Sequence, residues 1–173
     1  MLTRFLSYIL AIIMTIFPFF PNRQAMNNEK VAEAVIYAVE NKDAASMEDV
    51  MCKNIKENYA DLAGEINKIL SYIEGDVESI TWERAGGYSE SDGKGNSISQ
   101  NYQDYDIFTT KGVYGITLVI ETHNNFSPEE MGIRSISVFT LVKNENPDSS
   151  REYVYGETLY KISATEGIRD WHD

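Results

Sequence analysis

Two aspartates on either side of a tyrosine, Asp104 and Asp106, are the residues whose types and spacing best fit chemistry. A pair of carboxylates can act as a general base or supply two oxygen ligands to a hard cation. Both acids alternate with Tyr105 and Ile107, so in a strand they point to the face opposite those apolar side chains. We therefore expect solvated, outward carboxylates here rather than a buried acid–base pair.

Histidine offers a second kind of chemistry, and the chain contains His123 and His172. His123 follows Glu121 by two residues near a strand end, and the two side chains could pair as acid and base. A metal ion would need further ligands, which the sequence does not cluster nearby. No serine lies in a Gly-x-Ser-x-Gly context, the setting of a hydrolase nucleophile. We predict no catalytic set, no bound metal and no cofactor.

A glycine-rich stretch from Gly86 to Lys94 resembles a phosphate loop only superficially. Its spacing is wrong, no serine or threonine follows Lys94, and no helix follows to hold a phosphate. The oxygens of Glu90, Asp92 and Asn96 lack the closing acid of a calcium loop. We interpret this stretch as a solvated hairpin tip.

Charge and cysteine content exclude several classes of function. The chain has 15 basic and 27 acidic residues, a net charge of −12 and an isoelectric point near 4.6. Binding to nucleic acid or to anionic lipid requires a positive surface, so both are excluded. Cys52 is the single cysteine, so no intrachain disulfide can form, and we expect it to be a small buried apolar group.

An apolar run from Phe5 to Phe20 follows Arg4, and the first acid is Glu29. A short basic start before such a run is typical of export signals. The run is short for a membrane span, which needs about 20 residues. We therefore predict that residues 1–25 are either a cleaved signal peptide or an uncleaved anchor. In both cases the domain, residues 26–173, lies outside the cell or on the outer face of the cytoplasmic membrane, and only residues 5–20 contact the membrane.

Periodicity predicts the elements that would position these residues. Apolar residues at three- and four-residue spacing indicate helices, and alternation indicates strands. The expected helices cover residues 27–40, 44–51 and 54–73. The expected strands cover residues 77–88, 97–110, 113–123 and 133–142, with a further strand at Tyr153 and Tyr155 and a short one at 168–171. Helices followed by hairpin-linked strands predict one α+β domain, with N-terminal helices packed on an antiparallel sheet.

Two stretches resemble a family of small uncharacterised exported proteins, mostly lipoproteins, of clostridial and related Gram-positive bacteria. They are KVAEAV at 30–35, continuing through ENKD at 40–43 to CKNI at 52–55, and YDIFTTKGVY at 105–114. The resemblance implies the nuclear-transport-factor-2-like, or cystatin-like, fold, in which helices close the mouth of a strongly curved sheet to make a cone. This chain lacks the usual lipoprotein cysteine, and the family implies no reaction.

The cone of that fold often encloses a pocket, and aromatic side chains with polar tips could line it. Alternation alone predicts core packing for the same residues equally well. The pocket candidates are Tyr59, Trp82, Tyr105, Tyr114 and Phe139.

These observations predict an exported cell-envelope domain that binds a small ligand, a peptide or a surface protein without catalysis. The alternative is an enzyme of the isomerase or dehydratase type, in which a cone-lining carboxylate removes a proton next to a carbonyl and tyrosines bind the enolate. A homodimer through the open sheet face is also possible. The residues expected on that face are Val113, Thr117, Val119, Val138 and Val142.

Overall fold

A computed structural model describes residues 28–146, 149 and 151–164 of the chain. The predictions for the export leader, for the terminal strand at 168–171 and for His172 lie outside these residues. Over the described ranges, no helix is both long enough and apolar enough to cross a bilayer.

Among the described residues, four α-helices precede the sheet where the sequence predicted three. These are α2 (Asn28–Asn41), α3 (Ala44–Asp49), α4 (Lys53–Asn58) and α5 (Leu62–Tyr72). The prediction of one helix over 54–73 is wrong, because the backbone of Tyr59 is extended. Asp61 then begins α5, and its side chain accepts a hydrogen bond from the Gly64 N–H at 3.0 Å. An aspartate at the N-cap position accepts a hydrogen bond from a free backbone N–H of the first helical turn. It therefore favours the start of a new helix, α5, over an extension of α4.

The strands form one antiparallel sheet in the order β1-β2-β3-β4-β5. They are β1 (Val77–Ser91), β2 (Ser97–Thr109), β3 (Val113–Asn124), β4 (Gly132–Lys143) and β5 (Tyr153–Ser163). The strand predicted around Tyr153 and Tyr155 is confirmed and extends to Ser163. A short 3-10 helix, Pro128–Glu130, lies in the loop before β4, where the sequence predicted a helical turn.

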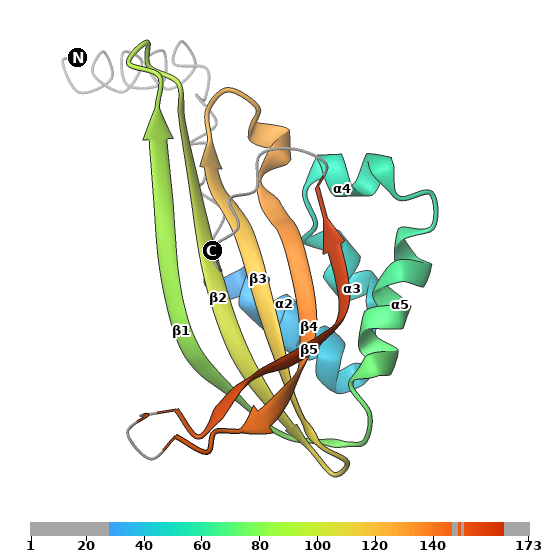
Figure 1. The fold of residues 1–173 in the computed structure, drawn as a ribbon. Coiled ribbons are helices and arrows are strands. Elements are labelled where there is room, and N and C mark those ends of the chain that lie inside the picture. Colours follow the sequence, from blue (N-terminus) through green and yellow to red (C-terminus); the bar gives the residue numbers. More distant parts are fainter. Residues whose placement is uncertain (1–27, 147–148, 150, 165–173) are drawn as a thin grey trace, which may run out of the picture.

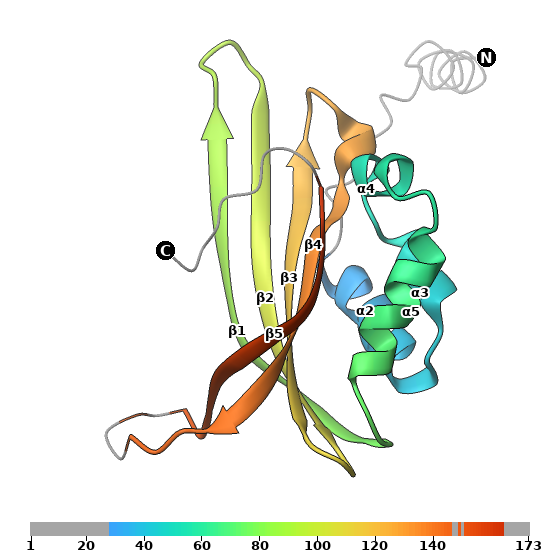
Figure 2. The same ribbon diagram turned by 45° about the vertical axis from the view of Figure 1, so that its right-hand side comes forward.

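The helices form a layer on one face of the sheet, as Figure 2 shows most clearly. The α+β class is therefore confirmed, with helices preceding and covering an antiparallel sheet. The sheet bends and twists along its length but is not strongly curled (Figures 1 and 2). The strongly curved cone that the family resemblance implies is thus not confirmed.

The core lies between the helical layer and the sheet. It is built from aliphatic side chains at helical spacing in α2 and α5 and at alternate positions in the strands, as the sequence predicted. The largest fully buried side chains are Met47, Ile55, Ile66, Ile69, Leu70, Ile73, Ile107, Ile116, Leu118, Ile120, Ile133 and Ile136. Cys52 is also fully buried, as expected, and burial raises the pKa of its thiol.

The opposite face, which we call the helix-free face, is partly covered by the chain itself. The first half of β5 turns over the lower part of this face (Figures 1 and 2). Tyr153 of β5 meets Phe108 of β2 edge-on, with ring centroids 5.7 Å apart. Tyr155 packs against Phe139 of β4 at 5.0 Å. Side chains on the helix-free face of β2 are therefore enclosed.

Backbone hydrogen bonds join the helical layer to β4 at one point. Cys52 N–H donates to the Ile133 carbonyl at 3.0 Å, and Ile133 N–H donates to the Val50 carbonyl at 2.8 Å. The neighbouring Gly132 has a φ of +132°, and a Cβ at this position would lie 2.7 Å from the Val50 oxygen. This close approach requires glycine.

Replacing Gly132 with alanine should lower the free energy of unfolding by roughly 2 kcal/mol or more, because strain at this φ adds to the clash. Urea denaturation measures the change. Gly112→Ala is the matched control, since Gly112 has no positive φ and its nearest neighbours are Tyr114 side-chain atoms at 3.6 Å or more. Equal stability of the two variants would contradict this account of the joint.

Candidate functional site

The two aspartates singled out from the sequence lie on the helix-free face, opposite Tyr105 and Ile107, as alternation predicted. The prediction that they are solvated is wrong, because Asp104 is 1% exposed and Asp106 is 4% exposed. The first half of β5 turns over this face, with Tyr155 next to Asp104, and Arg151 lies next to Asp106. Buried carboxylates need partners, so their surroundings decide their roles.

Asp104 has a full set of partners. Arg84 Nε of β1 donates a hydrogen bond to its Oδ2, and Thr117 Oγ1 of β3 donates to its Oδ1 at 2.7 Å. The hydrogen bond to Asp104 raises the pKa of the Arg84 guanidinium. Burial, followed by a hydrogen bond with Asp104, raises the pKa of the Tyr155 hydroxyl. Asp104 is thus the centre of a structural network that links β1, β2, β3 and β5.

Glu121, which the sequence suggested as a partner of His123, is also buried, and its carboxylate has hydrogen-bond partners. Gln100 Nε2 donates to its Oε2 at 3.1 Å, and Arg134 Nη1 lies 3.2 Å from the same oxygen. Asn124 Nδ2 donates to the other carboxylate oxygen. His123 instead has its Nε2 3.0 Å from Ser97 Oγ. The geometry therefore gives Glu121 a structural role.

Asp106 differs from both, because no hydrogen-bond donor in the described chain reaches its buried Oδ1. The nearest cation is Arg151, whose Nη2 lies 4.0 Å from Oδ1 and is itself buried without a hydrogen-bond partner. Burial raises the pKa of Asp106 to about 6, and the Glu83 carboxylate adds to the rise. Arg151 lowers this pKa and Asp104 raises it, each to a smaller degree.

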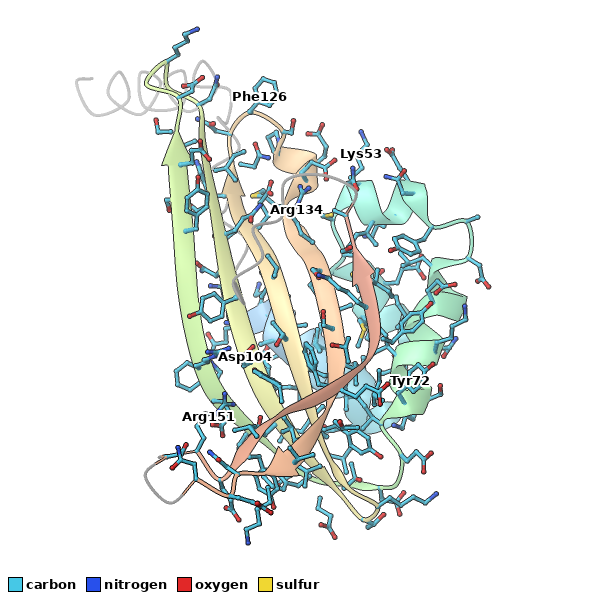
Figure 3. The ribbon with its side chains drawn as sticks, in the orientation of Figure 1. Lys53, Tyr72, Asp104, Phe126, Arg134 and Arg151 are labelled. Atoms are coloured by element: carbon cyan, nitrogen blue, oxygen red, sulfur yellow. The ribbon has the colours of Figure 1, made fainter. Side chains whose placement is uncertain are left out.

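A hollow of about 280 Å³ opens beside Asp106, and we call it the Asp106 hollow. Phe108 and Tyr153 supply an aromatic wall, and charged groups border the remainder. The lining residues are Thr81, Glu83, Asp106, Phe108, Arg151, Glu152 and Tyr153. In Figure 3, Asp104 and Arg151 lie in the lower half of the sheet, away from the Phe126 loop.

The space between α2 and the sheet is nearly filled, in contrast. The gap bordered by α2 and the strands has a volume of about 10 Å³ and is lined by Val35, Ile36, Val39, Ile80, Tyr105, Ile107 and Ile116. A single water molecule needs a volume of about 10–15 Å³. This apolar gap therefore offers no room for an organic ligand.

The five aromatic pocket candidates do not share one wall. Tyr105 borders the small gap under α2, and Tyr114 packs against the core. Tyr59 receives a hydrogen bond from the Ser163 N–H at 3.2 Å, which ties the α4–α5 break to the end of β5. Trp82 is 60% exposed on β1.

Phe139, the fifth aromatic candidate, lies on the helix-free face in contact with Tyr155. The residues expected on a dimer face are also divided. Val138 is fully buried in the core, Thr117 is 7% exposed and bonded to Asp104, and Val142 is 49% exposed. The extra residue at the register shift opposite Val138 and Phe139 lies in β5, so β4 alternates normally and these two neighbouring side chains point to opposite faces.

Sequence reasoning missed Arg151, Tyr153 and Glu83 as neighbours of Asp106. Arg151 and Tyr153 are 45 and 47 residues away from Asp106 in the chain, and only the fold of β5 over the sheet brings them near. Glu83 lies at a bulge between Trp82 and Arg84, which alternation does not predict. A local signal existed only for Asp106, which interrupts the apolar run of β2.

The hairpin tip is closed by its own hydrogen bonds. Asp92 accepts from the Lys94 N–H at 2.7 Å and from the backbone and side-chain nitrogens of Asn96 at 3.1 and 2.7 Å. In the described part of the chain, the hairpin tip included, no three His, Cys, Asp or Glu side chains form a group that could hold a metal ion.

The fold and site define an α+β domain with helices on one face of an antiparallel meander and a charged hollow on the other. The chain belongs to the family described as "Domain of unknown function (DUF5104)", which it matches over residues 34–164. No curated protein matches the chain. The expected membership of an uncharacterised family is thus confirmed at this level.

Truncating Glu121 should test its structural role. Glu121→Ala removes the carboxylate that lies 3.2 Å from the buried guanidinium of Arg134, 8% exposed, and leaves the more distant Glu130 at 3.7 Å, so we expect a loss of about 3 kcal/mol in unfolding free energy. Thermal or urea unfolding measures it. The double variant Glu121→Met, Arg134→Met should recover most of the loss, and Glu78→Ala, at an exposed position, should change stability by less than about 0.5 kcal/mol. A double variant no better than Glu121→Ala would contradict the pairing.

The raised pKa of Asp106 predicts a pH-dependent stability. The unfolded chain loses this proton near pH 4 and the folded chain near pH 6, so stability falls as pH rises through this window. Asp106→Asn removes the penalty and should be more stable than the wild type by about 1–3 kcal/mol at pH 8.

Urea denaturation between pH 4 and pH 8 measures the difference, which should shrink toward zero below pH 4. The exposed Asp76→Asn serves as the control. A difference that stays constant across the pH range would show that the side chain of Asp106 titrates normally.

Proposed function

We propose that this chain is an exported domain that binds a small ligand in the Asp106 hollow without catalysing a reaction. The single observation that carries the proposal is the pair formed by Asp106 Oδ1 and Arg151 Nη2. Both atoms are buried, both lack a hydrogen-bond partner, and they face each other at 4.0 Å beside a hollow of about 280 Å³.

Unsatisfied buried polar groups support this reading because they are rare and destabilising. More than about 90% of buried polar groups in proteins have a partner, and leaving one without a partner costs about 1–3 kcal/mol. Asp104 and Glu121 on the same face have their partners. Among these three buried acids Asp106 is the exception, and a ligand in the hollow would supply the hydrogen-bond donor that its Oδ1 lacks.

The location proposed for the domain rests on the apolar run from Phe5 to Phe20 and on the acidic composition. We propose that this run directs the domain to the outer face of the cytoplasmic membrane or beyond it. The order of helices and meander is compatible with the nuclear-transport-factor-2-like fold, and we retain kinship with that fold as part of the proposal. The ligand site, however, lies on the face opposite the usual cone.

A second function is favoured by one observation, the pKa of about 6 for Asp106. A carboxylate that titrates near neutral pH and borders a hollow could act as a general base in an isomerase or dehydratase. The acid would then be Asp106, on the helix-free face, rather than a residue lining a cone.

Ligand-detected NMR on the full chain tests the proposal, with a mixture of small amines, carboxylates, amino acids and aromatic alcohols. Thr81 is exposed and lines the hollow, so Thr81→Trp should fill the hollow and abolish binding. Ser89→Trp places the same bulk on an exposed position of β1 away from the hollow and should leave binding intact.

The fate of bound compounds separates the two functions. Compounds recovered unchanged support the binding role, whereas conversion that disappears in Asp106→Asn supports the enzyme. If no compound binds the wild type, or if Thr81→Trp binds as well as the wild type, the Asp106 hollow is not the site.

A further inference from the structure

Resting on the proposed function, we infer that the ligand of the Asp106 hollow is a free α-amino acid with an apolar side chain. Its ammonium group would donate to Asp106, its carboxylate would accept from Arg151, and its side chain would lie on the Phe108–Tyr153 wall.

The spacing of the two protein charges carries the inference. Arg151 Nη2 and Asp106 Oδ1 are 4.0 Å apart, which is too far for a direct hydrogen bond. Each therefore retains capacity for a charged partner of the opposite sign. An α-amino acid carries both partners on one carbon atom, so a single small molecule can satisfy both groups. Charge-assisted hydrogen bonds of this kind are about twice as strong as neutral ones.

The charges around the hollow favour a zwitterion over an anion. Glu83 and Glu152 border the hollow together with Asp106, against the single cation Arg151 among the lining residues. A phosphate or dicarboxylate would meet three acids. An ammonium group is attracted to this side of the hollow, and Arg151 leaves one place for a carboxylate.

Arg151 is held in place for such a contact. Its guanidinium carbon lies 5.3 Å from the centre of the Tyr155 ring, which supports it by a cation–π contact. Its side chain is 28% exposed as a whole, while the Nη2 atom that faces Asp106 is buried. A positioned planar guanidinium matches a carboxylate better than a flexible lysine does.

The aromatic wall and the size of the hollow indicate the chemistry and the size of the ligand's side chain. Phe108 and Tyr153 meet at an interplanar angle of 76° and both line the hollow. Ligand pockets usually measure about 300–1,000 Å³, so a hollow of about 280 Å³ suits a molecule of one amino acid and not a peptide. An apolar side chain can then be buried against the two rings.

Binding should weaken in acid, since Asp106 accepts from the ammonium group only when it is ionised. Its pKa is raised to about 6 by burial, by Glu83 of β1 and by Asp104 of β2, and is lowered by Arg151. Affinity should therefore be nearly constant above pH 7 and fall by up to about tenfold per pH unit below pH 6.

Isothermal titration calorimetry of the full chain with phenylalanine at pH 7.5 tests the inference. Phenethylamine lacks the carboxylate and 3-phenylpropionate lacks the ammonium, so both should bind at least about tenfold more weakly. Asp106→Asn should weaken phenylalanine and phenethylamine and leave 3-phenylpropionate nearly unchanged. Arg151→Met should give the reverse pattern. The controls Glu157→Gln and Lys143→Met change exposed charges on β5 and β4 and should have no effect.

Thermal unfolding confirms that each variant is folded before its binding is measured. Equal affinity for phenylalanine and either analogue overturns the inference, as does an equal effect of both variants on all three compounds. If phenylalanine does not bind, while other compounds bind the wild type and Thr81→Trp abolishes their binding, the inference is wrong and the proposed function stands. If nothing binds, both fail.

Discussion

Charged side chains buried on the helix-free face impose the main constraint on this fold, because each must find a partner away from water. In most antiparallel sheets with one layer of helices, the second face is solvated. Here the first half of β5 turns over part of that face. Asp104 accepts hydrogen bonds from Arg84 and Thr117. Glu121 accepts hydrogen bonds from Gln100, Asn124 and Arg134.

Asp106 is the exception among these buried acids, because no donor of the described residues reaches its Oδ1. An ionised carboxylate without a donor destabilises the native state, which the rise of its pKa to about 6 expresses. Proteins keep such groups mainly where a ligand or a reaction needs them. The helix side of the sheet shows the opposite condition, with an apolar gap of only about 10 Å³. The sheet therefore has a closely packed face under α2 and, opposite it, a face with an unsatisfied buried carboxylate oxygen.

Local patterns predicted the parts of this structure that depend on local physics. Alternation placed Asp104 and Asp106 opposite Tyr105, and helical spacing found the buried faces of α2 and α5. The break at Tyr59 was missed because the apolar spacing continues through it, although Asp61 is a strong helix-capping residue.

The burial of the aspartates could not be predicted from their own strand. It depends on Arg151, which precedes β5, and on Tyr153 and Tyr155 of β5, all of which reach β2 only through the twist of the whole sheet. Sheet curvature is also a property of all strands together, so a family resemblance in two short stretches did not fix it.

The backbone joint between the helical layer and β4 has a consequence for how the native state opens. Because Cys52 N–H donates to the Ile133 carbonyl and Ile133 N–H donates to the Val50 carbonyl across the two layers, local fluctuations of the helices are coupled to the start of β4. The far ends of β1 and β2 extend beyond the helices and have no such tie (Figure 2). Amide hydrogen exchange should therefore divide the molecule into a slow unit around Ile133 and a fast hairpin around Ser89.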